Sequence, residues 1–359
     1  MKYEYWFAQI PHLSDRKKYL LREYMGTAES IFYIEETKLK KIKFLNEKDA
    51  NTIIRAKKAV DLGTLLSNLK KKSIRFIPWF SEEFPKKLHE IPDPPYAIYV
   101  KGNMPEETNG AAAIVGARQC TAYGEKYALE YGEKLAQCGI SIISGLARGI
   151  DGLGHRGALM GNGDTYAVLG CGADICYPRE HIGLYTDILE RGGGIISEFS
   201  PGTPPVPHNF PKRNRIISGL SDMVLIMEAR EKSGSLITAD MALEQGRDVY
   251  ALPGPVDSVL SRGCNQLIRQ GAGILLTPEI LLEELGFSSF ITGAKIDKNK
   301  KVLETKENMV YSRLCPYPKN LSQLAGETSL TAGELLEQLV SLELKGYIKE
   351  ISKNYYVTL

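Results

Sequence analysis

Residues 111–155, AAAIVGARQCTAYGEKYALEYGEKLAQCGISIISGLARGIDGLGH, contain the pattern that decides the fold. An apolar run at 111–116 is followed by a helical segment at 124–139 and by a second apolar run at 141–144. Uninterrupted apolar runs are typical of strands buried on both faces, and a helix between two of them is typical of a parallel pair. This stretch therefore predicts a strand–helix–strand unit.

The same alternation continues toward the C-terminus. Helical segments separate five further apolar runs, at 166–170, 194–197, 223–227, 249–254 and 273–277. Seven such strands predict a doubly wound α/β domain with a mostly parallel sheet. We place this domain at 73–287, with an extended, proline-rich lead-in at 77–105.

Two smaller units flank this α/β domain. Residues 1–72 carry apolar residues at helical spacing and predict a small helical N-terminal domain. Residues 288–305 lose apolar periodicity and predict a linker. Residues 306–359 predict three helices, the last with Leu335, Leu336, Leu339 and Leu342 on one face, and a terminal hairpin, which is the pattern of a winged helix. Such units contact duplex DNA or another protein, and the sequence leaves both roles open.

Composition excludes several classes of protein. A length of 359 residues suits two or three domains, and 43% hydrophobic with 25% charged residues excludes a fibrous or wholly disordered chain. No apolar run approaches the roughly 18–20 residues of a membrane span. The N-terminus, MKYEYWFAQI, lacks the features of a signal peptide. We therefore expect a cytoplasmic protein without a membrane span.

The cysteines and the charge distribution constrain the chemistry further. The six cysteines form no CxxC pair and have no histidine at ligand spacing, so we expect reduced thiols, no metal site and no cofactor. Residues 1–75 contain 17 Lys and Arg against 9 Asp and Glu. That basic segment suits either nucleic acid or a solvated helical surface, and both interpretations remain open.

Two loops after predicted strands suit an anion. Ligands of open α/β sheets bind beyond the carboxyl ends of the strands. Gly116 permits a tight turn, and Arg118 offers a fork of donors just before a helix. After the next strand, Ser144 and Gly145 precede Arg148 and another helix start. An arginine beside a helix N-terminus suits phosphate, although both loops can instead serve fold geometry alone.

Neither loop has a standard nucleotide-binding motif. The spacing GxGxxG is absent at the first turn, and GxxxxGK[ST] is absent from the chain. These absences argue against a dinucleotide site of the usual kind and against ATP hydrolysis by a P-loop.

A basic cluster with an aromatic residue follows the proline-rich loop PGTPPVPH, at the start of a predicted helix. In the segment FPKRNR, Lys212, Arg213 and Arg215 surround Asn214, and Phe210 stands beside them. Basic groups for phosphates and an aromatic face for a base are the two components of single-strand recognition. Cations at a helix N-terminus oppose the macrodipole, which favours a bound anion over a merely solvated helix start.

The remaining candidates are weaker. Gly234 and Ser235 follow a strand and offer either backbone donors to the same cleft or only a helix cap. Asp151 and His155 form an i, i+4 pair, which is more often a structural hydrogen bond than half of a catalytic dyad. No nucleophile with an obvious base emerges, so we predict no catalytic residue.

Seven motifs stand in the order and spacing of one known family. They are IVGARQCTAYG, SGLARGIDGLGH, VLGCGADICYP, ISEFSPGTPP, NFPKRNRIISGLSD, EKSGSLITADMALEQGRDVYALPG and SRGCNQLIRQGA. Over roughly residues 76–285 the chain resembles the DNA processing protein A (DprA/Smf) family. The helical N-terminal segment and the winged helix resemble the ends of that family as well.

The resemblance implies an extended Rossmann-like domain that binds single-stranded DNA without sequence preference. It also implies a non-catalytic homodimer that protects incoming DNA and loads RecA recombinase onto it during natural transformation. By this resemblance Arg118 contacts phosphate and Phe210 stacks on a base, while Ser144 and Gly145 give backbone contacts. Polar contacts would come from Arg213, Asn214 and Arg215.

One departure from the family and one alternative function remain. Several members carry a lysine shortly before the phenylalanine, where this chain has Val206 to Asn209, so Lys212 is the candidate replacement. The alternative is a phosphoribohydrolase-like enzyme acting on a nucleotide. Such enzymes use PGGxGTxxE, and this chain has only PGPVDS at 253–258.

Overall fold

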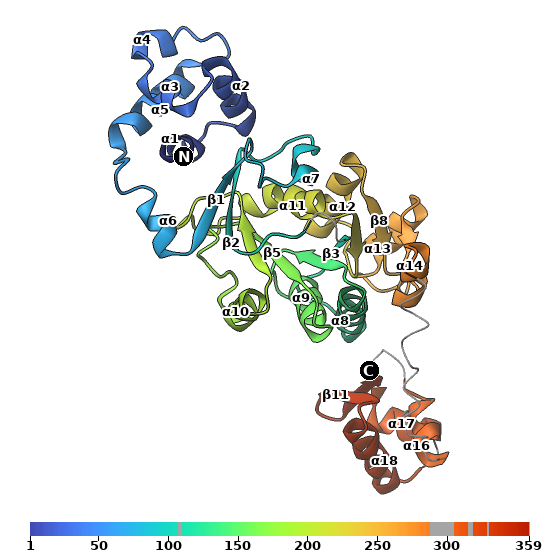
Figure 1. The fold of residues 1–359 in the computed structure, drawn as a ribbon. Helices are drawn as coiled ribbons and strands as arrows, with labels where there is room; N and C mark the ends of the chain where they lie inside the picture. The colour runs from blue at the N-terminus through green and yellow to red at the C-terminus, as the bar shows by residue number, and fades with distance from the viewer. Residues whose placement is uncertain (107–109, 288–304, 315–318, 329, 359) are drawn as a thin grey trace.

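A computed structural model describes residues 1–106, 110–287, 305–314, 319–328 and 330–358. The predicted linker at 288–305 lies outside the described residues except for its last position. Within these ranges the chain forms an N-terminal helical unit, a large mixed sheet covered by helices and a C-terminal winged helix (Figure 1). The predicted fold class is therefore confirmed, whereas the exact domain boundaries remain predictions.

The N-terminal unit consists of short helices around one apolar core. They are α1 (Lys2–Ala8), α2 (Asp15–Met25), α3 (Ala28–Tyr33), α4 (Glu36–Leu39), α5 (Glu47–Ala59) and α6 (Ser67–Lys71). Polar caps fix the helix starts: Asn46 and Asp49 form a reciprocal capping box at the start of α5. Phe7, Leu21 and Ile53 are fully buried in the shared core.

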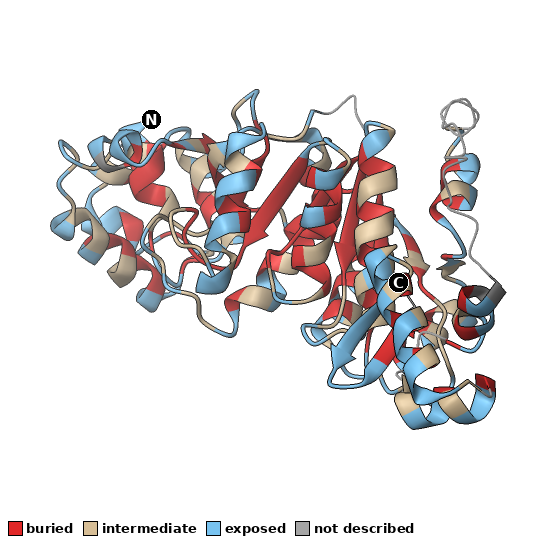
Figure 2. Ribbon diagram, turned by 90° about the horizontal axis from the view of Figure 1, so that it is seen from below, coloured by how far each residue is buried: buried red, intermediate tan, exposed pale blue. Residues whose placement is uncertain are grey.

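The large sheet has nine strands in the order β1-β2-β6-β5-β4-β3-β7-β8-β9. All seven predicted strands are present and pair in parallel: β3 (Ala111–Val115), β4 (Ser141–Ser144), β5 (Thr165–Leu169), β6 (Gly194–Ser197), β7 (Met223–Ile226), β8 (Asp248–Ala251) and β9 (Gly273–Ile274). The residues of these strands are buried (red in Figure 2), because helices cover both sides of the sheet (Figure 1), and this burial explains the uninterrupted apolar runs.

The stretch predicted as an extended lead-in contains sheet strands instead. β1 (Ile74–Pro78) pairs antiparallel with β2 (Ala97–Gly102), and β2 pairs antiparallel with β6. The prolines of the intervening segment obscured this pattern, because they interrupt the chain between the two strands. The sheet is thus extended by two antiparallel strands on the side that faces the N-terminal unit (Figure 1).

Two helical layers cover the sheet. One face packs against α8 (Ala122–Gln137), α9 (Ile150–Met160) and α10 (Ile182–Glu190), and the other packs against α11 (Asn209–Leu220) and α12 (Gly234–Glu244) (Figure 1). Shorter helices complete the domain: α7 (Lys86–His89), α13 (Arg262–Arg269) and α14 (Pro278–Glu284). Buried apolar side chains fill the space between the sheet and each layer.

The winged helix has the predicted order of elements. It contains α16 (Thr305–Tyr311), β10 (Lys319–Asn320), α17 (Leu321–Thr328), α18 (Ala332–Leu344), β11 (Ile348–Ser352) and β12 (Tyr355–Thr358). Leu335, Leu339 and Leu342 of α18 are fully buried in its core. Leu336 was grouped with them from spacing, but it is 41% exposed because it lies one position off the buried stripe.

No helix in the described ranges is long and apolar enough to cross a membrane. The five cysteines that the structure describes are all unbonded, and no cluster of metal-ligating side chains occurs among the described residues.

Candidate nucleic-acid interface

The topology opens a cleft beside β3. The chain runs outward from β3 through β4, β5 and β6, returns through α11 to β7, and then continues in the opposite direction. Loops diverge where the strand order reverses, which is where open α/β sheets bind ligands. A cavity of about 710 Å³ lies at this point, and we call it the switch-point cleft.

Most of the sequence-predicted site residues line this cleft. Those that do are Gly116, Arg118, Arg148, Phe210, Arg213, Asn214, Gly234 and Ser235. The other four, Ser144, Gly145, Lys212 and Arg215, do not line it.

An aromatic platform and an unpaired guanidinium lie at the centre of the cleft. The Arg118 Cζ atom is 5.7 Å from the centroid of the Phe210 ring. The side chain of Arg118 is exposed and has no ion pair or hydrogen bond to any residue that the structure describes. The Phe210 ring rests on Gly170, where a Cβ would come within 2.8 Å of the ring, so a bulkier residue at 170 would displace the platform.

Tyr177 enlarges this platform. Its ring centroid is 5.6 Å from that of Phe210, with 31° between the ring planes, and the side chain is 43% exposed. Tyr177 was not among the predicted site residues, because the loop that carries it lies far from Phe210 along the chain.

Arg213 belongs to the floor of the cleft rather than to its free surface. It is only 4% exposed, and its Nη1 donates to the carbonyl of Gly145 at 2.8 Å and to the carbonyl of Val168. Asp151 lies beside it and accepts a hydrogen bond from the Gly145 amide at 3.2 Å. Burial raises the pKa of Asp151, and the charge of Arg213 opposes that rise. Arg213 therefore ties α11 to β4 and β5, and its expected role as a polar DNA contact needs correction.

Ser144 and Gly145 are likewise occupied by the fold. The hydroxyl of Ser144 is buried and donates to the carbonyl of Ile114 at 2.6 Å. Gly145 packs so closely against Arg213 that a Cβ there would lie 2.4 Å from its Nη1. The Gly145 backbone, which was expected to contact DNA, binds Arg213 and Asp151 instead.

The expected pairing of Asp151 with His155 is wrong. His155 is fully buried, and its Nδ1 lies 2.6 Å from the hydroxyl of Thr165. Asp151 instead turns toward Gly145 and Arg213. Burial lowers the pKa of His155 to about 3, so the ring is neutral near pH 7.

Lys212 and Arg215 lie on the back of α11. The helical period of 3.6 residues places Phe210, Arg213 and Asn214 on one face and these two residues on another. Glu198 pairs with both, at 2.6 Å from Lys212 Nζ and 2.8 Å from Arg215 Nη2. Both residues are therefore already paired with Glu198, and their phosphate contacts stay predictions. Lys212 does not line the cleft, so it does not take the place of the missing family lysine there.

Arg148 is exposed at the edge of the cleft but is not free. Its guanidinium forms a two-point pair with Glu180, including Nη2 to Oε2 at 2.9 Å. This hydrogen bonding lowers the pKa of Glu180, which stays ionised at neutral pH. A phosphate would have to compete with that carboxylate for Arg148.

The helix N-termini around the cleft differ in what occupies them. At α8 the buried carboxylate of Glu228 accepts from the amide of Thr121 at 2.9 Å and from its hydroxyl at 2.6 Å. At α9 the amide of Ile150 donates to the carbonyl of Ala117 at 3.2 Å, a close approach that Gly149 permits with a φ of +68°. The two helix starts expected to bind an anion therefore already hold a carboxylate and a carbonyl of the fold.

The N-terminus of α12 is the open one. Ser233 forms no side-chain cap there, and its hydroxyl instead lies 2.7 Å from that of Ser235. Asn214 donates from Nδ2 to the carbonyl of Gly234 at 3.3 Å, which joins α11 to this helix start. The exposed Arg230, which was also not among the predicted site residues, lines the cleft close by. Its position shortly after β7 matches that of Arg118 after β3, and this signal could have identified it.

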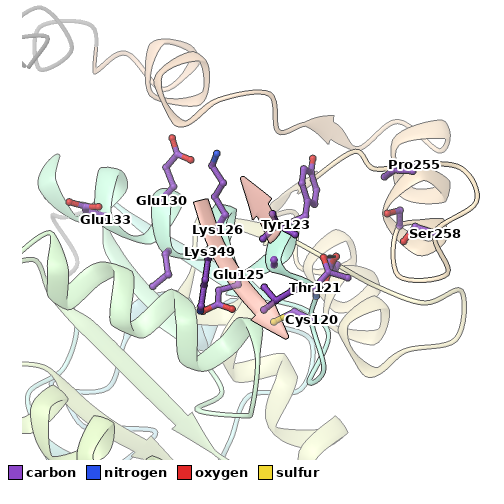
Figure 3. Close-up of a pocket in the computed structure, with 16 residues that line it drawn as sticks. Cys120, Thr121, Tyr123, Glu125, Lys126, Glu130, Glu133, Pro255, Ser258 and Lys349 are labelled. Carbon is purple, nitrogen blue, oxygen red and sulfur yellow. Dashed lines mark hydrogen bonds between the residues drawn. The ribbon is translucent and has the colours of Figure 1, made fainter. Parts of the chain in front are cut away.

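A second cavity, of about 880 Å³, lies between α8 and the hairpin of the winged helix (Figure 3). Glu125, Glu130 and Glu133 of α8 line it together with Glu228, against the lysines Lys126 and Lys349. Burial raises the pKa of Glu130. This surplus of carboxylates disfavours a phosphate backbone, so the smaller switch-point cleft is the better candidate for nucleic acid.

Comparison with known proteins agrees with the architecture. A family model for the DNA recombination-mediator protein A matches residues 75–286, and a model for the DprA winged helix domain matches residues 297–352. Protein Smf of Escherichia coli is 40% identical over 302 residues, which cover 80% of this chain and 78% of that one. The DNA processing protein DprA of Bacillus subtilis is 40% identical over 225 residues, covering 62% of this chain and 75% of that one.

Two solved structures are also similar. DNA processing protein A from Streptococcus pneumoniae has a TM-score of 0.70 at 32% identity, covering 79% of this chain and 98% of that one. DNA processing protein A from Helicobacter pylori, described for its single-stranded DNA binding mode, has a TM-score of 0.55 at 28% identity, covering 60% of this chain and 96% of that one. The chain belongs to the DNA recombination-mediator protein A family, also called DprA/Smf.

Proposed function

We propose that the switch-point cleft binds single-stranded DNA without sequence preference and that the protein is a non-catalytic recombination mediator. The observation that carries this proposal is the exposed Arg118 guanidinium beside the Phe210 and Tyr177 rings. A base would stack on the rings, and the adjoining phosphates would contact Arg118, Arg230 and the open N-terminus of α12. The Helicobacter pylori relative, described as binding single-stranded DNA, supports the same assignment.

The composition of the cleft explains why binding would be independent of sequence. Every base has a π-face that stacks on an aromatic ring, and phosphates are common to all sequences. The amide group best suited to read a base edge, that of Asn214, is engaged by the carbonyl of Gly234. Duplex DNA keeps its bases stacked within the helix, so the partly buried ring of Phe210 would not reach them.

The non-catalytic part of the proposal rests on the state of the cleft's ionisable groups. The carboxylate nearest the floor, Asp151, is held by the Gly145 amide and the Arg213 charge, so it is not free to act as a base. The alternative is a phosphoribohydrolase-like enzyme, and the PGPVDS segment at 253–258 gives it no support. The carbonyl of Gly254 in this segment is engaged within the fold, because it accepts a hydrogen bond from Asn265 Nδ2 at 2.9 Å. Release of free base from a nucleoside monophosphate would contradict a non-catalytic role.

The partners in this proposal are RecA and a second copy of the chain. A mediator holds a strand until RecA polymerises on it, so the protein should accelerate RecA filament formation on single-stranded DNA. Exposed apolar side chains near the β9 edge of the sheet, Ile274, Leu276 and Ile280, are consistent with a homodimer.

Binding of a labelled dT oligonucleotide of about 35 nucleotides across a salt series tests this function. We expect salt-sensitive binding that a matched duplex competes for poorly. Equal affinity for duplex, or no binding at low salt, would contradict the proposal. A RecA filament assay on the same oligonucleotide then tests the mediator role.

A further inference from the structure

Helix α11 links the cleft to the N-terminal helical unit. Its front carries Phe210 and Asn214 in the cleft, and its back carries Lys212 and Arg215. We propose that Asp15 and Glu198 are positioning residues for DNA binding, because they hold the back of α11 and thereby fix the orientation of Phe210. This inference rests on the proposed function of the cleft.

The contacts come from separate parts of the chain, and a third carboxylate, Asp93, accepts a hydrogen bond from Arg215 Nε at 3.2 Å. Glu198 follows β6 and forms a two-point pair with Arg215, at 2.8 Å and 3.2 Å, besides its contact with Lys212. Asp15 opens α2 of the N-terminal unit, and its Oδ2 lies 3.4 Å from Lys212 Nζ and 3.7 Å from Arg215 Nη2. The N-terminal unit therefore forms ion pairs with α11 through the carboxylate of Asp15.

The chemistry of this contact favours positioning over simple stabilisation. The side chains of Glu198 and Arg215 are 3% and 6% exposed, and Asp15 is 12% exposed. Burying charges costs desolvation energy that apolar residues of similar size would avoid, whereas a charged cluster admits few arrangements. Burial opposes the charge on Lys212, but Glu198 and Asp15 outweigh that effect and raise its pKa. The same carboxylates raise the pKa of Arg215, so both cations on the back of α11 stay charged at neutral pH.

Two features make Phe210 sensitive to the clamp, by which we mean the contacts of Asp15 and Glu198 with the back of α11. Phe210 is on the same rigid helix as Lys212, and its ring already touches Gly170, so a small rotation of α11 would move the ring off its support. The residues that line the cleft all lie between positions 115 and 260. An effect of Asp15 on base stacking must therefore pass through α11.

The experiment compares Asp15→Asn and Glu198→Gln with wild type on two probes, dT of about 35 nucleotides and an abasic strand of the same length. We expect Glu198→Gln to weaken dT binding about tenfold and Asp15→Asn about threefold, because stacking contributes about 1–3 kcal/mol per base. Affinity for the abasic strand and the salt dependence should change less than about twofold, since the phosphate contacts remain. Glu83→Gln is the matched control, because Glu83 pairs with Arg75 at 3.1 Å on an exposed surface, and neither residue forms an ion pair or hydrogen bond with a described residue of α11.

Hydrogen exchange of Asn209–Leu220 supplies a readout without DNA. Faster exchange there in both variants, with unchanged exchange in α8, supports the clamp. This result would stand even if the wild-type protein bound no DNA, an outcome that would refute only the proposed function. Equal losses for dT and abasic strands, or unchanged exchange in α11, would overturn the inference. If Glu198→Gln fails to fold, Asp15→Asn decides alone, since Asp15 lies at the edge of the cluster.

Discussion

The switch-point cleft and the winged helix both present helices to solvent, but with opposite chemistry. The cleft offers Arg118 and Arg230, neither of which is paired with a residue that the structure describes. Recognition helices of helix-turn-helix modules read DNA with basic and polar side chains. The last helix of the winged helix, α18, contains no lysine or arginine and exposes the apolar residues Leu336, Val340 and Leu344. The difference supports the proposed binding of DNA in the cleft and suits α18 to protein contact.

Two arginines of the cleft also differ from each other in exposure and in bonding. Arg118 is exposed and unpaired within the described ranges, whereas Arg213 is buried and bonded to main-chain carbonyls. Substituting each one should therefore change a different property of the protein, binding in the first case and stability in the second.

The largest effect is expected for Arg213→Ala. Removing this guanidinium leaves Asp151 buried without its counter-charge, which should cost about 3–5 kcal/mol of unfolding free energy in denaturant titrations. Arg118→Ala, at an exposed position, should change stability by less than about 0.5 kcal/mol. Similar stabilities for the two variants would contradict the distinction between the buried Arg213 and the exposed Arg118.

The loss in Arg213→Ala should depend on pH. Burial already raises the folded-state pKa of Asp151, and loss of Arg213 raises it further. A raised folded pKa stabilises the protein below the unfolded pKa, and that contribution is lost as the pH rises through the folded value. The stability deficit should therefore be smaller near pH 4 than near pH 8, and a constant deficit would contradict the buried-carboxylate account.

Phe210→Ala should have the largest effect on binding itself. Loss of the stacking platform should weaken dT binding about 10–100-fold, corresponding to about 1–3 kcal/mol, while binding of an abasic strand changes little. Phe80→Ala is the matched control, because Phe80 is 45% exposed outside the cleft, and it should stay within about twofold of wild type. Equal losses of dT affinity in Phe210→Ala and Phe80→Ala would contradict the assignment of base stacking to Phe210.

Arg118→Ala should weaken binding about tenfold at moderate salt and reduce the salt slope by about 0.7 for the lost phosphate contact. Arg148→Ala should have a smaller effect, because Glu180 already neutralises that guanidinium. Fluorescence anisotropy across a salt series measures both quantities. A larger loss of affinity in Arg148→Ala than in Arg118→Ala would contradict the prediction that Arg118 contributes more to binding.

The smallest effect is expected in the winged helix. Arg313, Lys349 and Lys353 are exposed and lie in none of the ion pairs found in its described part. Their simultaneous change to alanine in the full chain should leave dT affinity within about twofold, because the proposed phosphate contacts lie in the cleft. A tenfold loss would assign part of the DNA path to this domain.

The repeating apolar runs predicted the parallel strands, because burial on both faces leaves a signal in each strand separately. β1 and β2 were missed since their pairing joins two segments separated by prolines, which local patterns do not record. The composition of FPKRNR predicted a functional helix but not its orientation. Only the packing shows that Phe210 faces the cleft while Arg215 faces Glu198. Tyr177 and Phe210 meet through tertiary folding alone.

Photocrosslinking tests the central claim most directly. A dT strand carrying 5-iodouracil, which crosslinks to stacked aromatic side chains, would be irradiated with the full-length protein and the modified peptides identified by mass spectrometry. The account predicts crosslinks at Phe210 or Tyr177 that disappear in Phe210→Ala. Crosslinks confined to residues 305–358 would contradict it and move DNA binding to the winged helix.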